Sequence, residues 1–502
     1  MANLARLLLD SVARFPERPA LRLGDLEVTY AELDAAGARV AGLLRERGVA
    51  PGDRVAIVLP NVPEFASAYF GALRLGAIVV PMNVLNKRRE IAFLLQESGA
   101  RVVFALEGMH EHAQAAADEA GADCVRVTVG AFPDGDAAPV DEVADAAPGD
   151  TAMLLFTSGT TGTPKGAELT HANLTRNAEI SAGMFGLGCE DVLLGALPLF
   201  HAFGQTCAMN TALRSGACLT LLPRFDPTQA LELLDAHAVT LCLGVPTMYA
   251  AMVERAEGFP AGRLRYCISG GSALPERVLR EAEALFGCPM LEGYGLTETS
   301  PVASFNKPGQ PRKVNSIGTP LEETEMRVVD ADGNDLPAGE PGEILIRGHG
   351  VMKGYWNQPE ASAHTLRGGW MHTGDLAYAD EDGYFFIVDR IKDMIIRGGL
   401  NVYPREVEEV LHEHPAVRAA AVVPVPHPVL GEEVGAAVVL REGAGATEKE
   451  LRTFVRDEIA AYKYPRHVWF VDALPEDATG KVRKREIAVP PDVVAKAAAR
   501  RG

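Results

Sequence analysis

The sequence has no run of twenty apolar residues and no closely spaced pair of cysteines. Even the stretch YFGALRLGAIVVPMNVL is interrupted by Arg74 and Pro81, so no membrane-spanning helix is predicted. The seven cysteines form no CxxC pair and none follows Cys288, which is typical of reduced, buried thiols and suggests neither a disulfide framework nor a zinc site. Asp10 and Arg14 break the short leucine run near the start, and no small-residue cleavage site follows it. A protein without membrane insertion and with a cytoplasmic location is therefore expected.

Basic residues are also scarce relative to acidic ones. The 48 Lys and Arg residues against 67 Asp and Glu residues give a formal net charge of -19 at pH 7. This excess of negative charge disfavours nucleic acid and anionic membranes as partners, so an anionic ligand must be held by a local pocket. With 502 residues, 47% of them hydrophobic, the chain can form one large core and a smaller second one. The sequence does not define the oligomeric state, and a homodimer is compatible with it.

Helical and strand patterns alternate from the start of the chain to about residue 300. Thr29 and Glu32 have the spacing of a capping box before the helical pattern YAELDAAGARVAGLLRERG. Residues 54–60 are predicted as a buried strand, 62–75 as a helix and AIVVPMN as the next strand. This βαβ order predicts an α/β fold with doubly wound, mostly parallel sheets.

The pattern changes twice in the second half of the chain. From about residue 317, short strands alternate with Gly-rich turns, which predicts a small β-barrel or antiparallel sheet. From about residue 392, two helical segments, the second opened by Thr447, alternate with two strand patterns. We therefore predict an N-terminal domain over residues 1–391 and a small α+β domain over residues 392–502.

The segment LFTSGTTGTPKG, residues 155–166, carries the most specific signal. An apolar strand enters a loop with three glycines and five hydroxyl residues, and Lys165 closes the loop. Backbone N–H groups and hydroxyls in such a loop can converge on a polyphosphate, and the ammonium supplies positive charge. This is not the Walker pattern, because Lys165 follows a proline and precedes a glycine. A plain surface loop would also have this composition.

Five motifs stand in the order that is found in adenylate-forming enzymes. They are TSGTTGTPKG, GYGLTET (residues 293–299), TGD (373–375), VDRIKDMIIRGGLNVYPREVE (388–408) and TGKVRKRE (479–486). Over nearly its whole length the chain resembles this superfamily, and it is most similar to bacterial fatty-acid–CoA ligases. The resemblance implies a mobile C-terminal domain, a carboxylic acid substrate, and ATP, Mg²⁺ and coenzyme A as cofactors. It also implies that the acid attacks the α-phosphate of ATP and that the acyl group of the adenylate then passes to coenzyme A.

The resemblance implies a role for each motif residue. Lys481 would bridge the substrate carboxylate and the α-phosphate, and Glu298 would bind Mg²⁺. Thr297 would donate its hydroxyl to the α-phosphate or to the substrate carboxylate. His201 would lie beside the acyl pocket, although a packed core histidine fits its apolar surroundings equally well. The residues expected to bind ATP are Thr157, Ser158, Gly159, Thr160, Thr161 and Lys165 at the phosphates, Gly270, Gly271, Glu292, Gly293, Tyr294 and Gly295 at adenine, and Asp375 and Arg390 at the ribose.

The second half-reaction is assigned to the C-terminal domain. Lys392 matches the hinge of relatives, and Gly398 and Gly399 match a face that the pantetheine arm passes. The cations expected to meet coenzyme A phosphates are Arg397, Lys463 and Arg466. Arg397 and Leu400 depart from the residues that many CoA ligases have beside the glycine pair, namely Lys or Ser before it and Tyr after it.

The expected pocket segments predict the kind of acid. Residues 200–210, 244–252, 270–272 and 291–304 contain no Lys or Arg, so a second carboxylate on the substrate would be buried without a partner. Malonyl-CoA synthetases have an arginine where this chain has Gly293. A medium- or long-chain fatty acid is therefore predicted, and cinnamate- or benzoate-type acids are the second choice.

Three further functions would fit part of the same motif set. An acyl-AMP ligase that serves a carrier protein shares the first half-reaction, and a luciferase-like oxygenase shares the fold. A non-catalytic nucleotide binder is the third, and the joint presence of Lys165, Glu298, Asp375, Arg390 and Lys481 argues against it. The motifs therefore favour an enzyme that forms an adenylate and transfers its acyl group.

Overall fold

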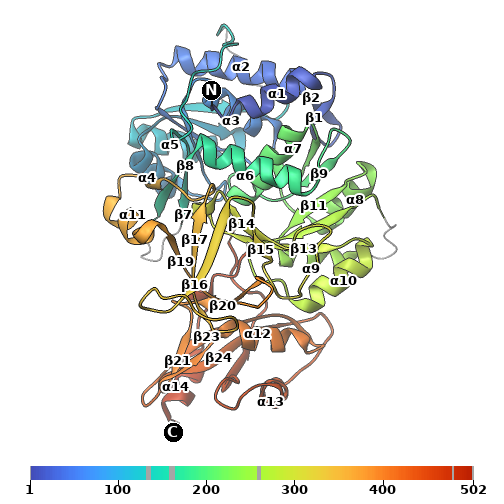
Figure 1. Ribbon diagram of the computed structural model, residues 1–502, viewed down its shortest axis with the longest axis vertical. Helices are drawn as coiled ribbons and strands as arrows, with labels where there is room; N and C mark the ends of the chain where they lie inside the picture. Colours follow the sequence, from blue (N-terminus) through green and yellow to red (C-terminus); the bar gives the residue numbers. More distant parts are fainter. Residues whose placement is uncertain (1, 132–136, 158–163, 257–261, 478–479, 500–502) are drawn as a thin grey trace.

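The computed structural model describes residues 2–131, 137–157, 164–256, 262–477 and 480–499 (Figure 1). A large body carries the N-terminus at the top of the view, and a smaller lobe at the bottom carries the C-terminus. Within the described ranges, no helix has both the length and the apolar character needed to cross a membrane. The two lobes provide the frame for a site at their junction.

Seven strands form the first sheet, in the order β18-β8-β7-β4-β3-β5-β6. Their bounds are β3 Arg54–Val58, β4 Ile78–Pro81, β5 Ala100–Leu106, β6 Asp123–Val127, β7 Thr151–Thr157, β8 Lys165–Thr170 and β18 Gly354–Tyr355. The strands from β7 to β6 pair in parallel. Strand β8 pairs antiparallel with β7, and β18 pairs antiparallel with β8. Alternate residues of β3 belong to two separate cores. Val55 and Ile57 pack into one core, and Ala56 and Val58 pack into the other. Both faces of the sheet are therefore covered, as expected for a parallel sheet.

Helices connect and cover these strands. They are α1 Arg6–Arg14, α2 Tyr30–Glu46, α3 Pro63–Arg74, α4 Arg88–Ser98, the 3₁₀ turn η1 Glu107–Met109 and α5 His110–Ala120. The predicted capping box at α2 is confirmed, because Thr29 N–H donates to Glu32 Oε2 (2.8 Å) and Glu32 N–H donates to Thr29 Oγ1 (3.2 Å). The predicted segments 54–60, 62–75 and AIVVPMN correspond to β3, α3 and β4, each within a few residues.

The second sheet has nine strands, in the order β15-β14-β13-β12-β11-β9-β10-β1-β2. The bounds are β1 Pro19–Leu23, β2 Leu26–Thr29, β9 Val192–Gly195, β10 Cys218–Leu221, β11 Leu241–Gly244, β12 Tyr266–Ser269, β13 Met290–Gly295, β14 Val302–Phe305 and β15 Thr319–Pro320. Its helical segments are α6 His171–Met184, the π-helix η2 Phe203–Asn210, α7 Thr211–Ser215, α8 Pro227–Ala236, α9 Pro246–Arg255, α10 Glu276–Phe286 and the 3₁₀ turn η3 Thr297–Thr299. One continuous core joins this sheet to the first, so the doubly wound α/β prediction is confirmed.

The region from residue 317 forms an antiparallel sheet of four strands, in the order β16-β17-β19-β20. The bounds are β16 Thr324–Val329, β17 Gly342–Gly348, β19 Met371–Ala379 and β20 Phe385–Arg390, with α11 Pro359–Thr365 and the 3₁₀ turn η4 Arg367–Gly369 between β18 and β19. The sequence predicted either a small β-barrel or an antiparallel sheet here, and the four strands form an antiparallel sheet. In register, β19 pairs Asp375 with Arg390 of β20, which brings two predicted ribose ligands side by side.

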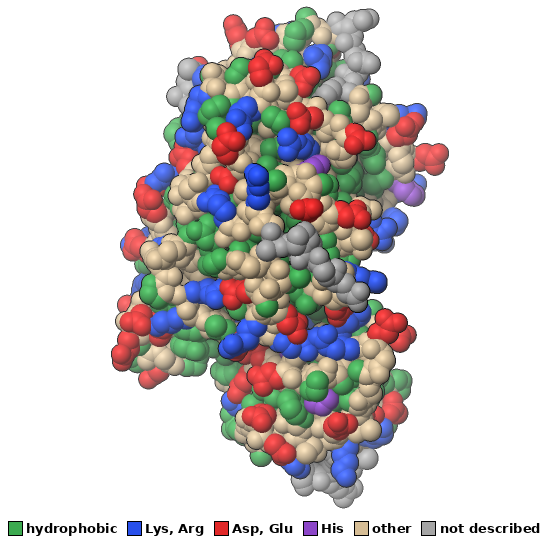
Figure 2. Space-filling model, turned by 90° about the vertical axis from the view of Figure 1, so that its right-hand side faces the viewer, with side chains coloured by type: hydrophobic (Ala, Val, Ile, Leu, Met, Phe, Trp, Pro, Cys, Tyr) green, Lys and Arg blue, Asp and Glu red, His purple; other side chains and the backbone are tan. Residues whose placement is uncertain are grey.

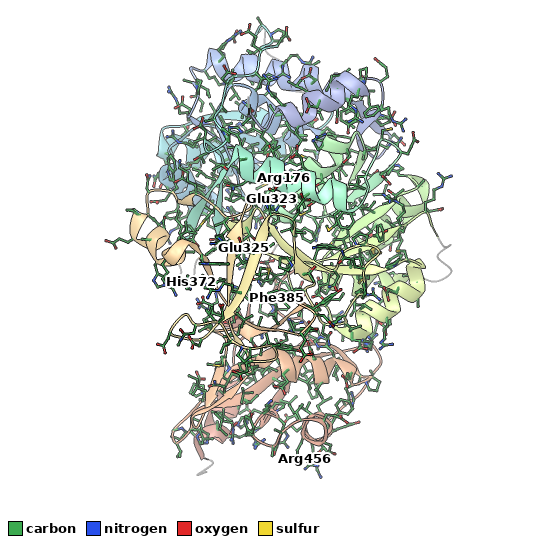
Figure 3. The ribbon with its side chains drawn as sticks, in the orientation of Figure 1. Arg176, Glu323, Glu325, His372, Phe385 and Arg456 are labelled. Atoms are coloured by element: carbon green, nitrogen blue, oxygen red, sulfur yellow. The ribbon has the colours of Figure 1, made fainter. Side chains whose placement is uncertain are left out.

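The four-stranded sheet is tied to the body by a charged contact. Arg176 on α6 lies between Glu322 and Glu323 of the turn before β16, with guanidinium–carboxylate distances of 2.9 to 3.1 Å (Figure 3). All three side chains are partly exposed, so this contact adds little free energy, but it links two segments that are far apart in the sequence.

The small lobe is an α+β unit after β20. Its sheet has the order β22-β21-β24-β23, with β25 pairing in parallel with β24. The bounds are β21 Ile395–Arg397, β22 Leu400–Val402, α12 Pro404–Glu413, β23 Val417–His427, β24 Gly431–Leu440, α13 Glu448–Glu458, β25 His467–Phe470, the 3₁₀ turn η5 Lys484–Glu486 and α14 Pro491–Ala499. Two small apolar clusters form its own core, and Thr447 caps α13 as predicted.

Low pH should weaken the body of the protein at His171. This side chain is 2% exposed, and its Nδ1 accepts the N–H of Leu4, 3.0 Å away. Burial lowers the pKa of His171 to about 4. Between the ordinary pKa of about 6.5 and this value the unfolded chain binds more protons, so stability falls as the pH falls through that window. At pH 5 the loss from His171 is on the order of 2 kcal/mol.

The variant His171→Asn isolates this effect, because its amide oxygen keeps an acceptor for Leu4 but does not titrate. Urea unfolding at pH 7.5 and pH 5 should show a smaller pH-dependent loss in the variant than in the parent protein. Equal losses in both proteins would contradict the assignment.

Candidate active site

The described ends of the Gly-rich loop lie next to Glu298. Thr157 ends β7 and Lys165 begins β8, and the two residues are paired across the hairpin. The Thr157 hydroxyl donates to Glu298 Oε1 over 3.5 Å, and Tyr355 OH donates to the same oxygen over 2.9 Å. Lys165 Nζ stands 5.3 Å from the centre of the Tyr355 ring. The hairpin therefore carries an ammonium, a hydroxyl and a carboxylate at one place.

Four of the predicted loop residues, namely Ser158, Gly159, Thr160 and Thr161, lie outside the described residues. Thr297 is described, and it precedes Glu298 in η3 with a half-buried side chain.

Asp375, Tyr294 and Arg390 form a second cluster. Tyr294 OH donates to Asp375 Oδ2 at 2.6 Å, and Arg390 Nε lies 2.9 Å from Oδ1. Asp375 is 3% exposed, its charge raises the pKa of Arg390, and burial together with Asp375 raises the pKa of Tyr294. A carboxylate has about four acceptor positions, so Asp375 still has two for other donors.

The predicted adenine residues lie at the adjacent ends of β12 and β13. Glu292 is 4% exposed and burial raises its pKa to about 7, while Leu274 N–H donates to Oε1 over 3.4 Å. A Cβ atom on Gly295 would stand 1.8 Å from the carbonyl oxygen of Pro301, and one on Gly293 would stand 2.3 Å from the Phe305 ring. These two glycines are therefore required by packing of the chain on itself, in addition to the role predicted from the sequence.

The end of β12 runs into Gly270 and Gly271. Gly271 has φ of +83°, a conformation that residues with a side chain rarely adopt. A Cβ atom on Gly270 would stand 3.3 Å from the Phe203 ring at the start of η2, so this turn and η2 pack closely.

Lys481 reaches from the small lobe to these residues. Burial, followed by the neighbouring charge of Arg390, lowers its pKa to about 8, while Asp375 and Asp477 oppose the shift. Lys481 also lowers the pKa of His201, whose main shift to about 4 comes from burial. The ammonium, the ribose cluster and the histidine are thus close enough to interact, although they come from both lobes.

A contact between Thr247 and Gly480 fixes the lysine segment against the body. The Thr247 hydroxyl donates to the carbonyl oxygen of Gly480 over 3.5 Å, and a Cβ atom on Gly480 would stand 2.7 Å from that hydroxyl. On the face in Figure 2, Lys and Arg side chains gather where the body meets the small lobe. A chain of net charge -19 therefore has local positive charge where an anion needs it.

The predicted coenzyme A residues lie apart from this cluster in the present arrangement. Gly398 (φ +58°) and Gly399 (φ +84°) form the turn between β21 and β22, where positive φ angles require glycine. Each predicted phosphate ligand contacts a side chain of the small lobe itself. Arg397 binds Glu433 through two nitrogens at 2.5 and 3.0 Å, Lys463 binds Glu406 at 2.7 Å, and Arg466 stacks on Tyr464 at 3.6 Å.

Three residues at the site were given no role from the sequence, namely Tyr355, Thr247 and Asp477. Tyr355 belongs to no motif, and Thr247 lies in the expected pocket segment 244–252. Only contacts between distant segments reveal what these two residues bind. Asp477 stands four residues before Lys481, and this proximity was its one signal in the sequence.

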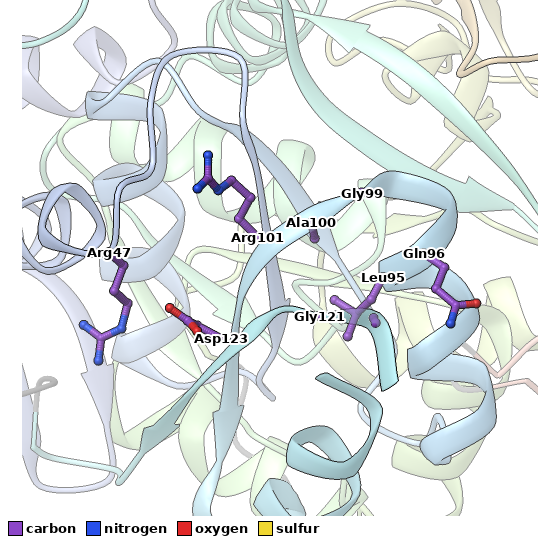
Figure 4. Close-up of a pocket in the computed structure, with 9 residues that line it drawn as sticks. Arg47, Leu95, Gln96, Gly99, Ala100, Arg101, Gly121 and Asp123 are labelled. Carbon is purple, nitrogen blue, oxygen red and sulfur yellow. The ribbon is translucent and has the colours of Figure 1, made fainter. Parts of the chain in front are cut away.

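A surface hollow of about 430 Å³ lies away from these residues (Figure 4). It lies at the end of the first sheet that is farthest from the β7–β8 hairpin in strand order. Its lining is Arg47, Leu95, Gln96, Gly99, Ala100, Arg101, Ala120, Gly121 and Asp123, and it contains no predicted site residue.

Comparisons with known proteins define the family. Residues 8–356 match the family model "AMP-binding enzyme", and residues 406–481 match "AMP-binding enzyme C-terminal domain". The chain is 37% identical to a long-chain-fatty-acid–CoA ligase of Bacillus subtilis (strain 168), over 97% of this chain and 94% of the relative. It is 41% identical to a feruloyl-CoA synthase of Amycolatopsis sp., over 94% of this chain and 96% of the relative.

The lobe arrangement is also similar to that of a solved relative. MatB from Rhodopseudomonas palustris, 34% identical over 96% of this chain and 97% of its own, gives a TM-score of 0.90 in its ATP-bound structure and 0.78 in its apo structure. The present arrangement therefore resembles the ATP-bound form more closely.

The chain belongs to the AMP-binding enzyme family, which confirms the resemblance to adenylate-forming enzymes. Within that family it is an ATP-dependent acid–CoA ligase of the AMP-forming kind.

Proposed function

We propose that the chain activates an apolar monocarboxylic acid, a medium- or long-chain fatty acid, as its acyl adenylate and then forms the coenzyme A thioester. The observation that carries this proposal is the position of the Lys481 segment, which contacts Thr247 of the body through Gly480 and brings the ammonium within electrostatic reach of Arg390, Asp375 and His201. A cation at this point offsets the repulsion between a carboxylate and the α-phosphate, and it acts most strongly on the charge that develops during transfer.

The two clusters suit the two ends of the nucleotide. Asp375 has acceptor positions left for a ribose diol, with Arg390 and Tyr294 fixing its orientation. Thr157 and Lys165 face the phosphate end, and Glu298 would hold Mg²⁺ there. One carboxylate is an ordinary protein contribution to a Mg²⁺ site, since phosphate and water oxygens complete the coordination. When bound, the metal neutralises charge on the phosphates.

We assign residues 392–502 to a mobile lid with a hinge at Lys392. Lys392 lies in the four-residue segment between β20, which ends at Arg390, and β21, which begins at Ile395, so it belongs to neither strand. Rotation would withdraw Lys481 and bring the Gly398–Gly399 turn to the thiol. Arg397, Lys463 and Arg466 remain the candidates for the coenzyme A phosphates, and the first two would have to exchange their carboxylate partners.

Pyrophosphate release against a panel of acids, each with and without coenzyme A, tests the function. Saturated acids of C8 to C16 should give the highest rates, and a thioester should form only with coenzyme A. Preference for malonate would contradict the proposal, because the expected pocket offers no cation for a second carboxylate. Product that accumulates as acyl adenylate despite coenzyme A would favour delivery to a carrier protein.

One observation favours a second candidate, an aromatic acid with a hydrogen-bonding substituent. Gln205 is 0% exposed, and neither its amide oxygen nor its nitrogen has a partner among the described residues. Its backbone N–H donates to the carbonyl oxygen of His201 at 2.9 Å, so it lies one turn farther along the segment that leads from His201 into η2. An acyl group extending inward from a carboxylate at His201 would pass this amide, and a phenolic hydroxyl would satisfy it.

The variant Gln205→Met separates the two candidates, because it keeps the side-chain length and removes the polar atoms. If the substrate is phenolic, kcat/KM for ferulate or coumarate should fall about tenfold while decanoate changes little. If the substrate is a fatty acid, the variant should retain or improve kcat/KM for decanoate. Comparing the two substrates in both proteins decides between them.

A further inference from the structure

Asp477 and Lys481 close a tight turn at the end of the small lobe. The Lys481 N–H donates to Asp477 Oδ1 at 3.1 Å, and the Asp477 N–H donates to the Lys481 carbonyl at 2.9 Å. Gly480 N–H donates to the Asp477 carbonyl at 3.0 Å, and Glu476 and Val482 form an antiparallel bridge outside the turn. The Asp477 side chain thus binds the backbone of the residue whose ammonium enters the site.

The charges around Lys481 are unevenly matched. Arg390 and Lys392, at the end of β20 and beyond it, repel the ammonium, while Asp375 of β19 and Asp477 attract it. Both oxygens of Asp375 already contact Arg390 or Tyr294. His201, which faces the lysine from the body, is uncharged at neutral pH because burial lowers its pKa to about 4. Of the two carboxylates that attract the ammonium, Asp375 is therefore shared with other partners, and Asp477 is the one in the same turn as Lys481.

We propose that Asp477 is a positioning residue for Lys481, holding the turn that aims the ammonium and supplying the negative charge that keeps it protonated before the phosphates bind. The inference depends on the proposed function of Lys481 in adenylate formation. Desolvation and the neighbouring cations Arg390 and Lys392 favour loss of the proton from the Lys481 ammonium, and a neutral amine cannot offset the charge of two anions. A carboxylate four residues away in the same turn moves with the lysine, so the pair stays together when the lobe rotates.

The variant Asp477→Asn separates the two parts of this role. Its amide oxygen still accepts the Lys481 N–H, but the negative charge is gone. The measurement is kcat/KM for ATP–pyrophosphate exchange against pH, which reports the pKa values of the free enzyme. The basic limb of the profile should move to lower pH by roughly 0.5–1 unit. Asp477→Ala also removes the acceptor, so its exchange rate at the optimum should fall by about tenfold.

Two controls make the result decisive. Asp472→Asn removes an equal charge from an exposed position in the same segment and should leave the pH profile unchanged. Transfer to coenzyme A from supplied acyl adenylate should survive in both Asp477 variants, which shows that the lobe is folded. A basic limb that does not move in Asp477→Asn would overturn the inference while leaving adenylation intact. Absence of exchange in the parent protein would overturn the proposed function itself.

Discussion

The variant Lys481→Ala should lose adenylate formation by roughly 10²–10³-fold and should keep thioester formation from supplied acyl adenylate. The loss is large because, in the proposed mechanism, the half-buried ammonium offsets the charge of both reacting anions. The second half-reaction begins from an adenylate in which these anions are already joined, so it no longer needs the lysine. ATP–pyrophosphate exchange measures the first step, and thioester release from synthetic acyl adenylate measures the second.

Arg483→Ala is the matched control for this variant. Arg483 lies two residues after Lys481 and forms an exposed ion pair with Glu486 at 2.8 Å, so its loss changes the charge of the segment but removes no group assigned to the reaction. Both half-reactions should remain near the parental rates. If Lys481→Ala lost the two steps to the same extent, the lysine would be acting on the structure of the lobe.

Much of the fold could be predicted because it depends on local pattern. The alternation of apolar strands and amphipathic helices up to residue 300 is visible in any short window, and the caps at Thr29 and Thr447 mark helix starts. The four-stranded sheet was less well defined by its sequence, because Gly-rich turns and short strands suit both an open sheet and a barrel. The pairing of β17 with both β16 and β19, and of β19 with β20, defines its order.

Candidate site residues could be predicted where a single motif contains the residue and implies its function. Lys481, Glu298 and Asp375 were predicted in this way, and the structure brings each to the junction of the lobes. Tyr355 could not be found, because its hydrogen bond to Glu298 joins residues that are 57 positions apart. The packing role of Gly293 and Gly295 was missed for the same reason, since Phe305 and Pro301 approach them only in the folded chain.

A motif also cannot reveal which charges are already neutralised. Arg397 and Lys463 were predicted as phosphate ligands from their sign and place, yet each contacts a carboxylate within the small lobe. Each pair joins residues that are more than thirty positions apart in the sequence, so sequence spacing does not show it. Free positive charge at the junction of the lobes is therefore more restricted than the number of basic residues suggests.

The variant Glu298→Gln should reduce adenylate formation by about 10²-fold and raise the Mg²⁺ concentration needed for half-maximal rate. Gln has nearly the same shape and can still accept from Thr157 and Tyr355 through its amide oxygen. What it loses is the negative charge that a hard divalent cation requires. The measurement is pyrophosphate release as a function of Mg²⁺ at a fixed ATP concentration.

The variant Tyr355→Phe serves as the comparison, because it keeps the Glu298 carboxylate and removes one hydrogen bond to it. Burial and Glu298 both raise the pKa of Tyr355, so the phenol stays protonated and donates at any pH where the enzyme is active. Its loss should therefore cost less than tenfold and should leave the Mg²⁺ requirement nearly unchanged. If Glu298→Gln and Tyr355→Phe had equal effects, and neither changed the Mg²⁺ dependence, Glu298 would be holding the β7–β8 hairpin and binding no metal.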